Sequence, residues 1–250
     1  MLLKCEKYLT VSTSSFLSVF SLTDGGYSTA ITVNKKFVFH IPETMDMKYA
    51  GILLCAGITT FSPLNRHILQ KGGGQGKHVG VVGFGGLGQM AVKLAKAMGA
   101  EVTVLSRNDS KKEQAAKLGA NLLVHADEAA VAAANRTFDL VLDTVAAPHP
   151  VAPLVNTIKV GGTYCLIGGV PAPFEISAFQ MLFSRQNLEG SLIGGIPETQ
   201  EMLNFCAKHN IVPEYEVISA AEASDHFKAM MTGTSDAKRA VLDISTIEKM

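Results

Sequence analysis

The sequence predicts an α/β protein: a doubly wound parallel sheet inserted into an incomplete antiparallel β domain. Short runs rich in β-branched residues alternate with helical patterns from residue 78 onward, which is typical of a parallel sheet with crossover helices. A glycine-rich turn joins the first of these runs to an amphipathic helix. The segments on either side of this block contain short strand patterns that find no place in it, which indicates a second domain.

Strands and helices alternate regularly through the α/β part. The expected strands cover residues 78–83, 101–106, 122–124, 138–143, 163–168 and 188–194. After the first strand, Ala91, Leu94, Ala95 and Met98 recur at the spacing of one helix face, and Gly99 is placed to end that helix. These residues should pack against the sheet.

The flanking segments predict the smaller β domain. Residues 27–33 and 37–41 are expected to form two strands joined around Asn34 and Lys35. Near the end of the chain we expect strands at 215–219 and 239–244 and a helix near 221–231, which should rejoin the first piece. The predicted division is residues 1–24 unassigned, 25–65 with 212–250 as the partial β domain, and 66–211 as the α/β domain.

Composition and charge exclude several functional classes. Of the 250 residues, 47% are apolar and 18% are charged, which suits a packed core and not a disordered chain. Lys plus Arg and Asp plus Glu each total 22, so no net field attracts nucleic acid or an anionic membrane. The apolar stretch at 16–22 is too short and too interrupted for an anchor. The widely spaced Cys5, Cys55, Cys165 and Cys206 form no zinc or disulfide pattern, which favours a cytoplasmic setting.

The glycine-rich turn is Gly83-Phe84-Gly85-Gly86-Leu87-Gly88. Because it lies between a strand and a helix, it predicts a dinucleotide-binding Rossmann domain. Gly83 would permit the tight turn, Gly85 would let the backbone approach a pyrophosphate, and Gly88 would let the helix lie close to the strand. The N–H groups at the helix start would face the phosphate charge. The alternative is a glycine-rich turn needed only for packing.

The end of the second strand favours NADP over NAD. A free ribose 2′-hydroxyl is usually held by Asp or Glu at this place, where the chain has Ser106 and Arg107. Together with Lys111, these side chains could bind a 2′-phosphate through charge-assisted hydrogen bonds. The missing carboxylate also argues against an S-adenosylmethionine methyltransferase. The nearest acid, Asp109, could serve only the next helix start, and Lys111 could be a solvated residue.

Three further strand ends should meet in the crevice where a dinucleotide binds. Thr144 and Val145 follow the fourth strand, Gly168, Gly169 and Val170 follow the fifth, and Gly194 and Gly195 close the sixth. They predict a flat surface for the nicotinamide arm of the cofactor. Each glycine could equally be needed for its turn alone.

A longer set of motifs resembles one enzyme family. The residues that carry this resemblance are Leu53-Leu54-Cys55-Ala56-Gly57-Ile58-Thr59-Thr60-Phe61-Ser62-Pro63-Leu64, residues 79–99, Gly25-Gly26-Tyr27-Ser28, Leu142-Asp143-Thr144, Gly190-Ser191-Leu192-Ile193-Gly194 and Glu198-Thr199-Gln200-Glu201-Met202-Leu203. From about Gly25 to Ile244 the chain resembles the zinc-containing medium-chain alcohol dehydrogenases, in their NADP-dependent branch of cinnamyl alcohol dehydrogenase-like enzymes. The resemblance implies a Rossmann domain inserted in a GroES-like catalytic domain.

The resemblance also implies roles for individual residues. Cys55 matches a catalytic zinc ligand, and Thr59 matches a residue near the nicotinamide. The turn from Gly83 to Gly88 matches the pyrophosphate site, and Ser106, Arg107 and Lys111 match the 2′-phosphate pocket. Ser191, Ile193 and Arg239 match positions near the cofactor, and residues 188–194 match the strand that pairs two subunits in a homodimer. The implied reaction is hydride transfer between NADP(H) and a primary alcohol or aldehyde.

The chain also departs from the family pattern. A catalytic zinc needs three protein ligands, and the family's upstream Cys segment and Gly-His-Glu segment have no match here. The four-cysteine structural zinc loop and the Ser or Thr and His of the proton relay have none either. We expect that the amino-terminal part of the catalytic domain is lost and that residues 1–24 are unrelated to the fold. Two alternatives stay open, a non-catalytic NADP-binding module and a zinc-free reductase of activated double bonds.

Overall fold

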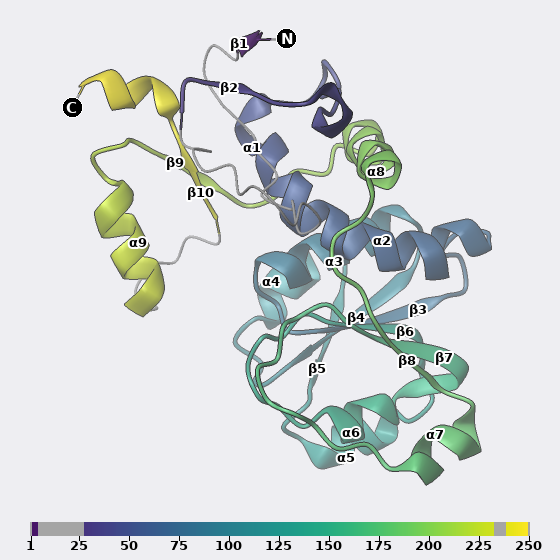
Figure 1. Cartoon of the computed structure of the whole chain (residues 1–250). Helices are drawn as coiled ribbons and strands as arrows, with labels where there is room; N and C mark the ends of the chain where they lie inside the picture. The colour runs from purple at the N-terminus through teal and green to yellow at the C-terminus, as the bar shows by residue number, and fades with distance from the viewer. Residues whose placement is uncertain (1, 5–27, 233–238, 250) are drawn as a thin grey trace. The chain divides into compact units, whose positions relative to one another are not determined.

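The computed structural model describes residues 2–4, 28–232 and 239–249 (Figure 1). The chain divides into two compact units, residues 1–58 with 194–250 and residues 59–193. The predicted division differs from these bounds, because it kept residues 194–211 with the α/β part and residues 59–65 with the β part. Most of that stretch is helix α8 (Ile196–Lys208), whose Met202 Sδ faces the Cα of Gly57 within its own unit. Of the unassigned residues 1–24, the structure describes only residues 2–4.

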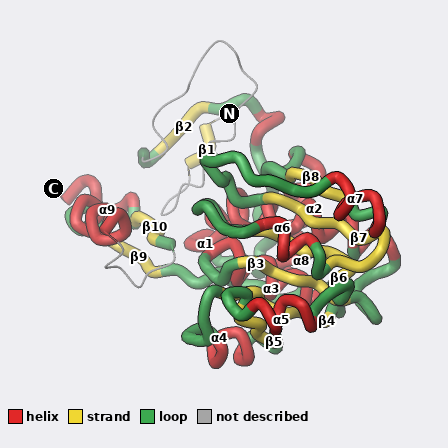
Figure 2. The backbone as a smooth tube through the Cα atoms, turned by 90° about the horizontal axis from the view of Figure 1, so that it is seen from below, coloured by secondary structure: helices red, strands yellow, loops and turns green. Residues whose placement is uncertain are grey.

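The unit of residues 59–193 contains the predicted parallel sheet. Its described strands are β3 (His78–Val82), β4 (Glu101–Ser106), β5 (Asn121–Val124), β6 (Phe138–Asp143), β7 (Ile158–Leu166) and β8 (Asn187–Gly190). They lie in the order β5-β4-β3-β6-β7-β8, and every neighbouring pair is parallel (Figure 2). The six expected strands are therefore confirmed.

Helices cover both faces of this sheet (Figure 1). On one face lie α3 (Gly86–Ala97) and α4 (Lys112–Lys117), and on the other lie α5 (Glu128–Ala133), α6 (Val151–Val155) and α7 (Ala178–Ser184). The strand order reverses between β3 and β6, since β4 and β5 lie on one side of β3 and the later strands lie on the other. Ligands of doubly wound sheets bind beyond the carboxyl ends of the strands at this reversal.

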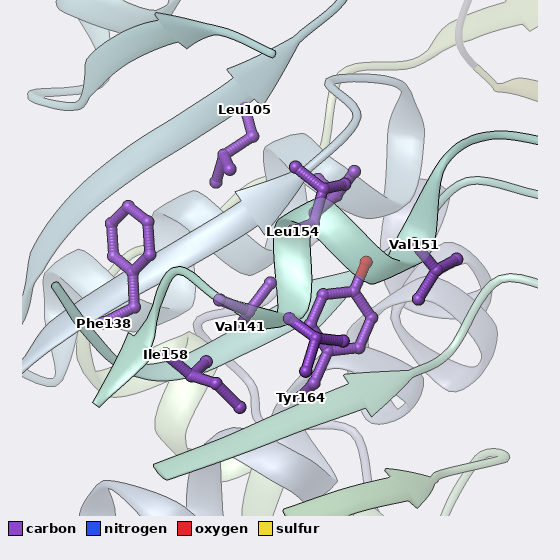
Figure 3. Close-up of a cluster of buried hydrophobic side chains, with 9 residues drawn as sticks. Leu105, Phe138, Val141, Val151, Leu154, Ile158 and Tyr164 are labelled. Carbon is purple, nitrogen blue, oxygen red and sulfur yellow. The ribbon is translucent and has the colours of Figure 1, made fainter. Parts of the chain in front are cut away.

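The core of the unit lies between the sheet and the helices. Ala91, Leu94, Ala95 and Met98 are buried as predicted, and Gly99 follows the helix at φ +90°. On the opposite face, Tyr164 belongs to a cluster of buried apolar side chains (Figure 3). The other members are Val82, Leu105, Phe138, Val141, Val151, Leu154, Val155 and Ile158. Burial of this apolar surface fixes α6 against β6 and β7.

In the other unit, the predicted pairing of residues 27–33 with 37–41 is wrong. Strand β2 (Ala30–Thr32) pairs antiparallel with β1 (Leu2–Lys4), and residues 35–37 form a short 3-10 helix. Asn34 starts this helix, because its side chain accepts a hydrogen bond from Lys36 N at 3.0 Å. Beyond it, the side-chain amide of Gln200 on α8 binds both backbone groups of His40 at 2.8 Å. A side chain therefore satisfies the backbone that was expected to pair as a strand.

The last predicted elements are present, with a different pairing. Strands β9 (Glu216–Ile218) and β10 (Ala240–Leu242) pair in parallel with each other, and α9 (Ala223–Thr232) lies between them in the sequence. Within the described residues, β9 and β10 form their own sheet and do not join β2 as expected. A helical connection returns the chain in the same direction, so the pair is parallel.

A run of helices precedes β3. It consists of α1 (Met47–Ile52), a π-helix (Leu53–Gly57), α2 (Ile58–His67) and a 3-10 helix (Leu69–Lys71). A further 3-10 helix, Ile244–Lys249, follows β10. Among the described residues, no helix combines the length and apolar character needed to cross a bilayer.

Candidate dinucleotide site

The glycine turn after β3 brings backbone segments very close together. Gly83 has φ +84°, and a Cβ added there would lie 2.9 Å from Thr144 Oγ1 and 2.9 Å from Val145 Cγ2. A Cβ on Gly88 would overlap the carbonyl oxygen of Gly83. Glycine at these two positions is therefore required by the packing of α3 against the turn and the end of β6. Binding of a nucleotide would instead depend on the side of the turn that faces solvent.

The exposed side of the turn is open at Gly85. This glycine is the N-cap of α3, and a Cβ added to it would meet nothing within 4 Å. Its φ of −85° is accessible to any residue, so neither strain nor packing requires glycine here. The side chain of Phe84 is buried, and the first N–H groups of a helix have no acceptor within it. The turn therefore fits a phosphate group that approaches the backbone at Gly85.

Polar and basic residues follow the end of β4. Ser106 is buried at the strand end, and its carbonyl oxygen accepts a hydrogen bond from His125 N at 2.8 Å. Arg107 is exposed and Lys111 is half-buried before α4. Within the described part of the chain, neither Arg107 nor Lys111 forms an ion pair. Asp109 is exposed, and its backbone carbonyl accepts from the N–H of the residue that starts α4.

His125 lies beside the end of β4, since its N–H group donates to the carbonyl of Ser106. Burial lowers the pKa of His125, and the charges of His149 and Arg107 lower it further. The acidic Asp143 acts in the opposite direction.

The loops after β6 and β7 pack closely against each other. Thr144 Oγ1 donates to the carbonyl of Val82 at 2.7 Å, which ties the first loop to β3. A Cβ on Gly168 would overlap the carbonyl of Val145, so only glycine permits this approach. The next residue, Gly169, is exposed and has open space where its Cβ would be. Val170 then forms a tight turn through a hydrogen bond from its N–H to Gly168 O at 3.1 Å.

A buried polar cluster joins these two loops and was not found from the sequence. The carboxylate of Asp143 is fully buried, and its Oδ2 atom accepts from the Tyr164 hydroxyl at 2.8 Å and lies 2.8 Å from His149 Nε2. Burial raises the pKa of Tyr164 well above 10.0, and the charge of Asp143 adds to this, so the hydroxyl stays a donor. The available signal was a histidine between two prolines, six residues after an aspartate at a strand end.

The structure also describes the three remaining predicted cofactor residues, two after β8 and one before β10. Ser191 Oγ accepts a hydrogen bond from Arg66 Nη2 at 3.1 Å. Ile193 has φ +49°, which is a strained conformation for a β-branched residue. Strain of this kind is concentrated at ligand sites, so it agrees with a functional position. Arg239 is half-buried just before β10, in the other unit.

Cys55 has no metal-binding partners among the described residues. It is exposed on the π-helix, and the structure as described contains no group of three or more His, Cys, Asp or Glu side chains able to hold a metal. A catalytic zinc needs three protein ligands, so the described residues do not fit it. Cys5 lies outside the described residues. Thr59 is buried in α2.

Comparisons with known proteins agree on one family. Residues 86–208 match the family described as zinc-binding dehydrogenase. Vomilenine reductase of Rauvolfia serpentina is 48% identical over 198 residues, which are 78% of this chain and 54% of that protein. A cinnamyl alcohol dehydrogenase of Sorghum bicolor superposes with a TM-score of 0.82 at 34% identity, over 90% of this chain and 63% of that one.

A second solved structure carries a nucleotide. The protein titled CAD from Helicobacter pylori, complexed with NADP(H), has a TM-score of 0.73 at 34% identity, over 87% of this chain and 61% of that one. The chain thus spans between 54% and 63% of the length of these three proteins. The sequence matches and the superposed Rossmann sheet agree with the motifs that carry the resemblance. Residues 86–208 are therefore identified as a zinc-binding dehydrogenase domain, and the proteins similar to the chain include cinnamyl alcohol dehydrogenases.

Proposed function

We propose that this chain binds NADP(H) at the carboxyl edge of its parallel sheet. The turn from Gly83 to Gly88 would hold the pyrophosphate, and Ser106, Arg107 and Lys111 would hold the 2′-phosphate. Thr144, Val145, Gly168, Gly169 and Val170 would line the nicotinamide half, with Ser191, Ile193 and Arg239 as further contacts. The observation that carries this proposal is the open backbone at Gly85, together with the residues at the end of β4. There the chain has Ser106 and Arg107 where a domain that binds NAD usually has Asp or Glu.

The reaction we propose is reduction of an aldehyde or oxidation of a primary alcohol. When bound, NADP(H) would supply or accept the hydride at nicotinamide C4. The chain's own contribution is to orient the nicotinamide through the two loops after β6 and β7. The names of the similar proteins support this class of reaction, because they include a reductase and a cinnamyl alcohol dehydrogenase.

A second candidate function is an NADP(H)-binding module without catalysis. It is favoured by the surroundings of Cys55, because the described residues place no group of three or more His, Cys, Asp or Glu side chains there or elsewhere. The proposed role of Cys55 as a zinc ligand needs two further ligands that the described residues do not provide. We therefore assign no step of the reaction to zinc.

Two measurements on the purified chain separate these functions. Titration with NADPH and NADH, followed by nucleotide fluorescence, should show tighter binding of NADPH. NADPH oxidation in the presence of an aromatic aldehyde should then proceed if the dehydrogenase proposal is correct. Binding without turnover would support the binding module, and absence of NADPH binding would contradict both.

The preference for NADPH should depend on Arg107. We expect Arg107→Asp to weaken NADPH binding by about 10- to 100-fold, because a charge-assisted hydrogen bond is lost and a carboxylate then repels the 2′-phosphate. NADH binding should be unchanged or tighter. Lys117→Asp makes the same charge change at the exposed far end of α4 and serves as the control. An unchanged ratio of the two affinities in Arg107→Asp would refute the pocket.

We also propose a cytoplasmic homodimer that acts on a small alcohol or aldehyde. The three described cysteines are free thiols, which supports a reducing compartment. Strand β8 ends the sheet and pairs with β7 on one side, which supports pairing of residues 188–194 with a second copy.

A further inference from the structure

The buried Asp143 connects the two loops that would hold the nicotinamide half. Its Oδ1 atom accepts from Val145 N at 3.0 Å, which fixes the start of the loop after β6. Its backbone carbonyl accepts from Ile167 N and Gly168 N, both at 2.9 Å, which fixes the start of the loop after β7. One residue therefore determines the separation of the two loops.

His149 completes this arrangement from the far end of the loop after β6. Its Nε2 atom lies 2.8 Å from Asp143 Oδ2, and its Nδ1 atom lies 2.9 Å from the carbonyl oxygen of Ala147. Its side chain is only 7% exposed. The loop from residue 144 to residue 150 is thus held at both ends by one carboxylate.

The contacts of Asp143 and His149 account for the polar atoms of the pair. A carbonyl oxygen can only accept, so Nδ1 of His149 donates to the carbonyl of Ala147. Both oxygens of Asp143 accept hydrogen bonds, Oδ1 from Val145 N and Oδ2 from the Tyr164 hydroxyl. Nε2 of His149 lies 2.8 Å from the same Oδ2 atom. The imidazole ring therefore bridges the buried carboxyl group and the backbone of the loop.

We infer that the His149–Asp143 pair is a positioning device for the nicotinamide half of the cofactor, an inference that rests on the proposed NADP(H) site. His149 need not touch the nucleotide. It holds the loop 144–150 in place, so that the backbone of Thr144 and Val145 stays packed against Gly168. The adenine half depends instead on the end of β4, which is tied to β5 through its own hydrogen bond from His125 N to Ser106 O.

This separation of the two halves provides the test. In His149→Gln, the side chain has one nitrogen in place of two on opposite sides of a ring, so it cannot keep the contacts to both Asp143 and Ala147. We expect NADPH to bind about tenfold more weakly, because at least one hydrogen bond to a charged group is lost from the loop. Adenosine 2′,5′-bisphosphate, which has the 2′-phosphate and no nicotinamide, should bind within about twofold of the wild-type affinity.

A matched control is His78→Gln. His78 is another partly buried histidine of the same unit, and its Nε2 atom lies 2.8 Å from Thr103 Oγ1. It starts β3, so it lies at the amino edge of the sheet, opposite the proposed site. Its substitution should leave the affinities for both ligands unchanged.

The other outcomes are decisive as well. Equal weakening of both ligands in His149→Gln would indicate a general structural role and overturn the inference, as would no change in NADPH affinity. If the wild-type chain binds adenosine 2′,5′-bisphosphate and NADPH, the proposed site stands whatever His149→Gln does. If the wild-type chain binds neither, the proposed function fails and the inference fails with it.

A measurement on the wild-type protein covers the case in which His149→Gln does not fold. Nitrogen-15 NMR of histidine-labelled protein can follow the ring of His149, whose signal is assigned by its change in Asp143→Asn. That signal should shift when NADPH is added and stay in place with adenosine 2′,5′-bisphosphate. A His149 signal that does not respond to NADPH, or that responds equally to adenosine 2′,5′-bisphosphate, would overturn the inference.

Discussion

At the scale of the residue, the turn after β3 contains glycines that are required for different reasons. Gly88 has no room for a Cβ, because the carbonyl of Gly83 fills that place. Gly85 has ample room and an ordinary backbone conformation. A glycine that neither packing nor strain requires is a better indication of ligand contact than one that the fold needs.

Alanine substitutions should separate these two reasons. Gly85→Ala should leave the free energy of unfolding unchanged within about 1 kcal/mol, and it should weaken NADPH binding about tenfold, because a methyl group would stand where the pyrophosphate approaches. Gly88→Ala should instead destabilise the chain by about 1–3 kcal/mol through overpacking. Thermal denaturation and NADPH titration of both variants test this. Normal NADPH affinity in Gly85→Ala would show that the turn serves packing alone.

At the scale of the element, Asp139 links three strands at the amino edge of the sheet. From β6 it accepts hydrogen bonds from His78 N on β3 at 2.9 Å and from Lys159 Nζ on β7 at 2.7 Å. Partial burial opposes ionisation of Asp139, but the hydrogen bonds and the charges of Lys159 and Lys77 outweigh it and lower its pKa below 3.8. Ionised Asp139 therefore stabilises the junction of β3, β6 and β7.

This junction should make stability depend on pH in the acid range. Because folding lowers the pKa of Asp139, its contribution is complete above the unfolded value of 3.8 and is lost as the pH falls through the lower folded value. Asp139→Asn should reduce the free energy of unfolding by about 1 kcal/mol at neutral pH, and the difference should vanish in strong acid. Urea denaturation across pH measures this. Asp225→Asn, at an exposed aspartate of α9 paired with Lys228, should show no such difference.

At the scale of the whole molecule, the unpaired edge of strand β8 favours association with a second chain. Strand β8 has a neighbour on one side only within the described structure, and Leu192 just beyond it is 73% exposed. An unpaired strand edge with exposed apolar residues favours association. The proposed homodimer would cover both.

Light scattering coupled to size exclusion can test this association. We expect a measured molar mass of about twice the 26.6 kDa of one chain. Leu192→Asp should shift it to the mass of a single chain, because a buried charge at the strand edge is costly. Phe183→Asp places the same charge at a 78% exposed residue of α7 and should leave the dimer intact. A monomeric wild-type chain would contradict the proposed interface.

The sequence by itself determined the α/β class, the six strands and the glycine turn. These features depend on local patterns: β-branched runs, a helical face from Ala91 to Met98, and glycines at fixed spacing between a strand and a helix. The position of Arg107 could be predicted in the same way, because this residue directly follows a strand that the sequence predicts. The roles of these site residues stay predictions.

Only the tertiary structure decided which segments pair and which polar groups meet. Residues 37–41 looked like a strand, but Gln200, far along the chain, satisfies the backbone of His40. Asp143, His149 and Tyr164 come together because β6 and β7 are neighbours and because a loop turns back onto a buried carboxylate. Such contacts depend on chain reversal and burial between distant segments, and no local pattern in the sequence encodes them.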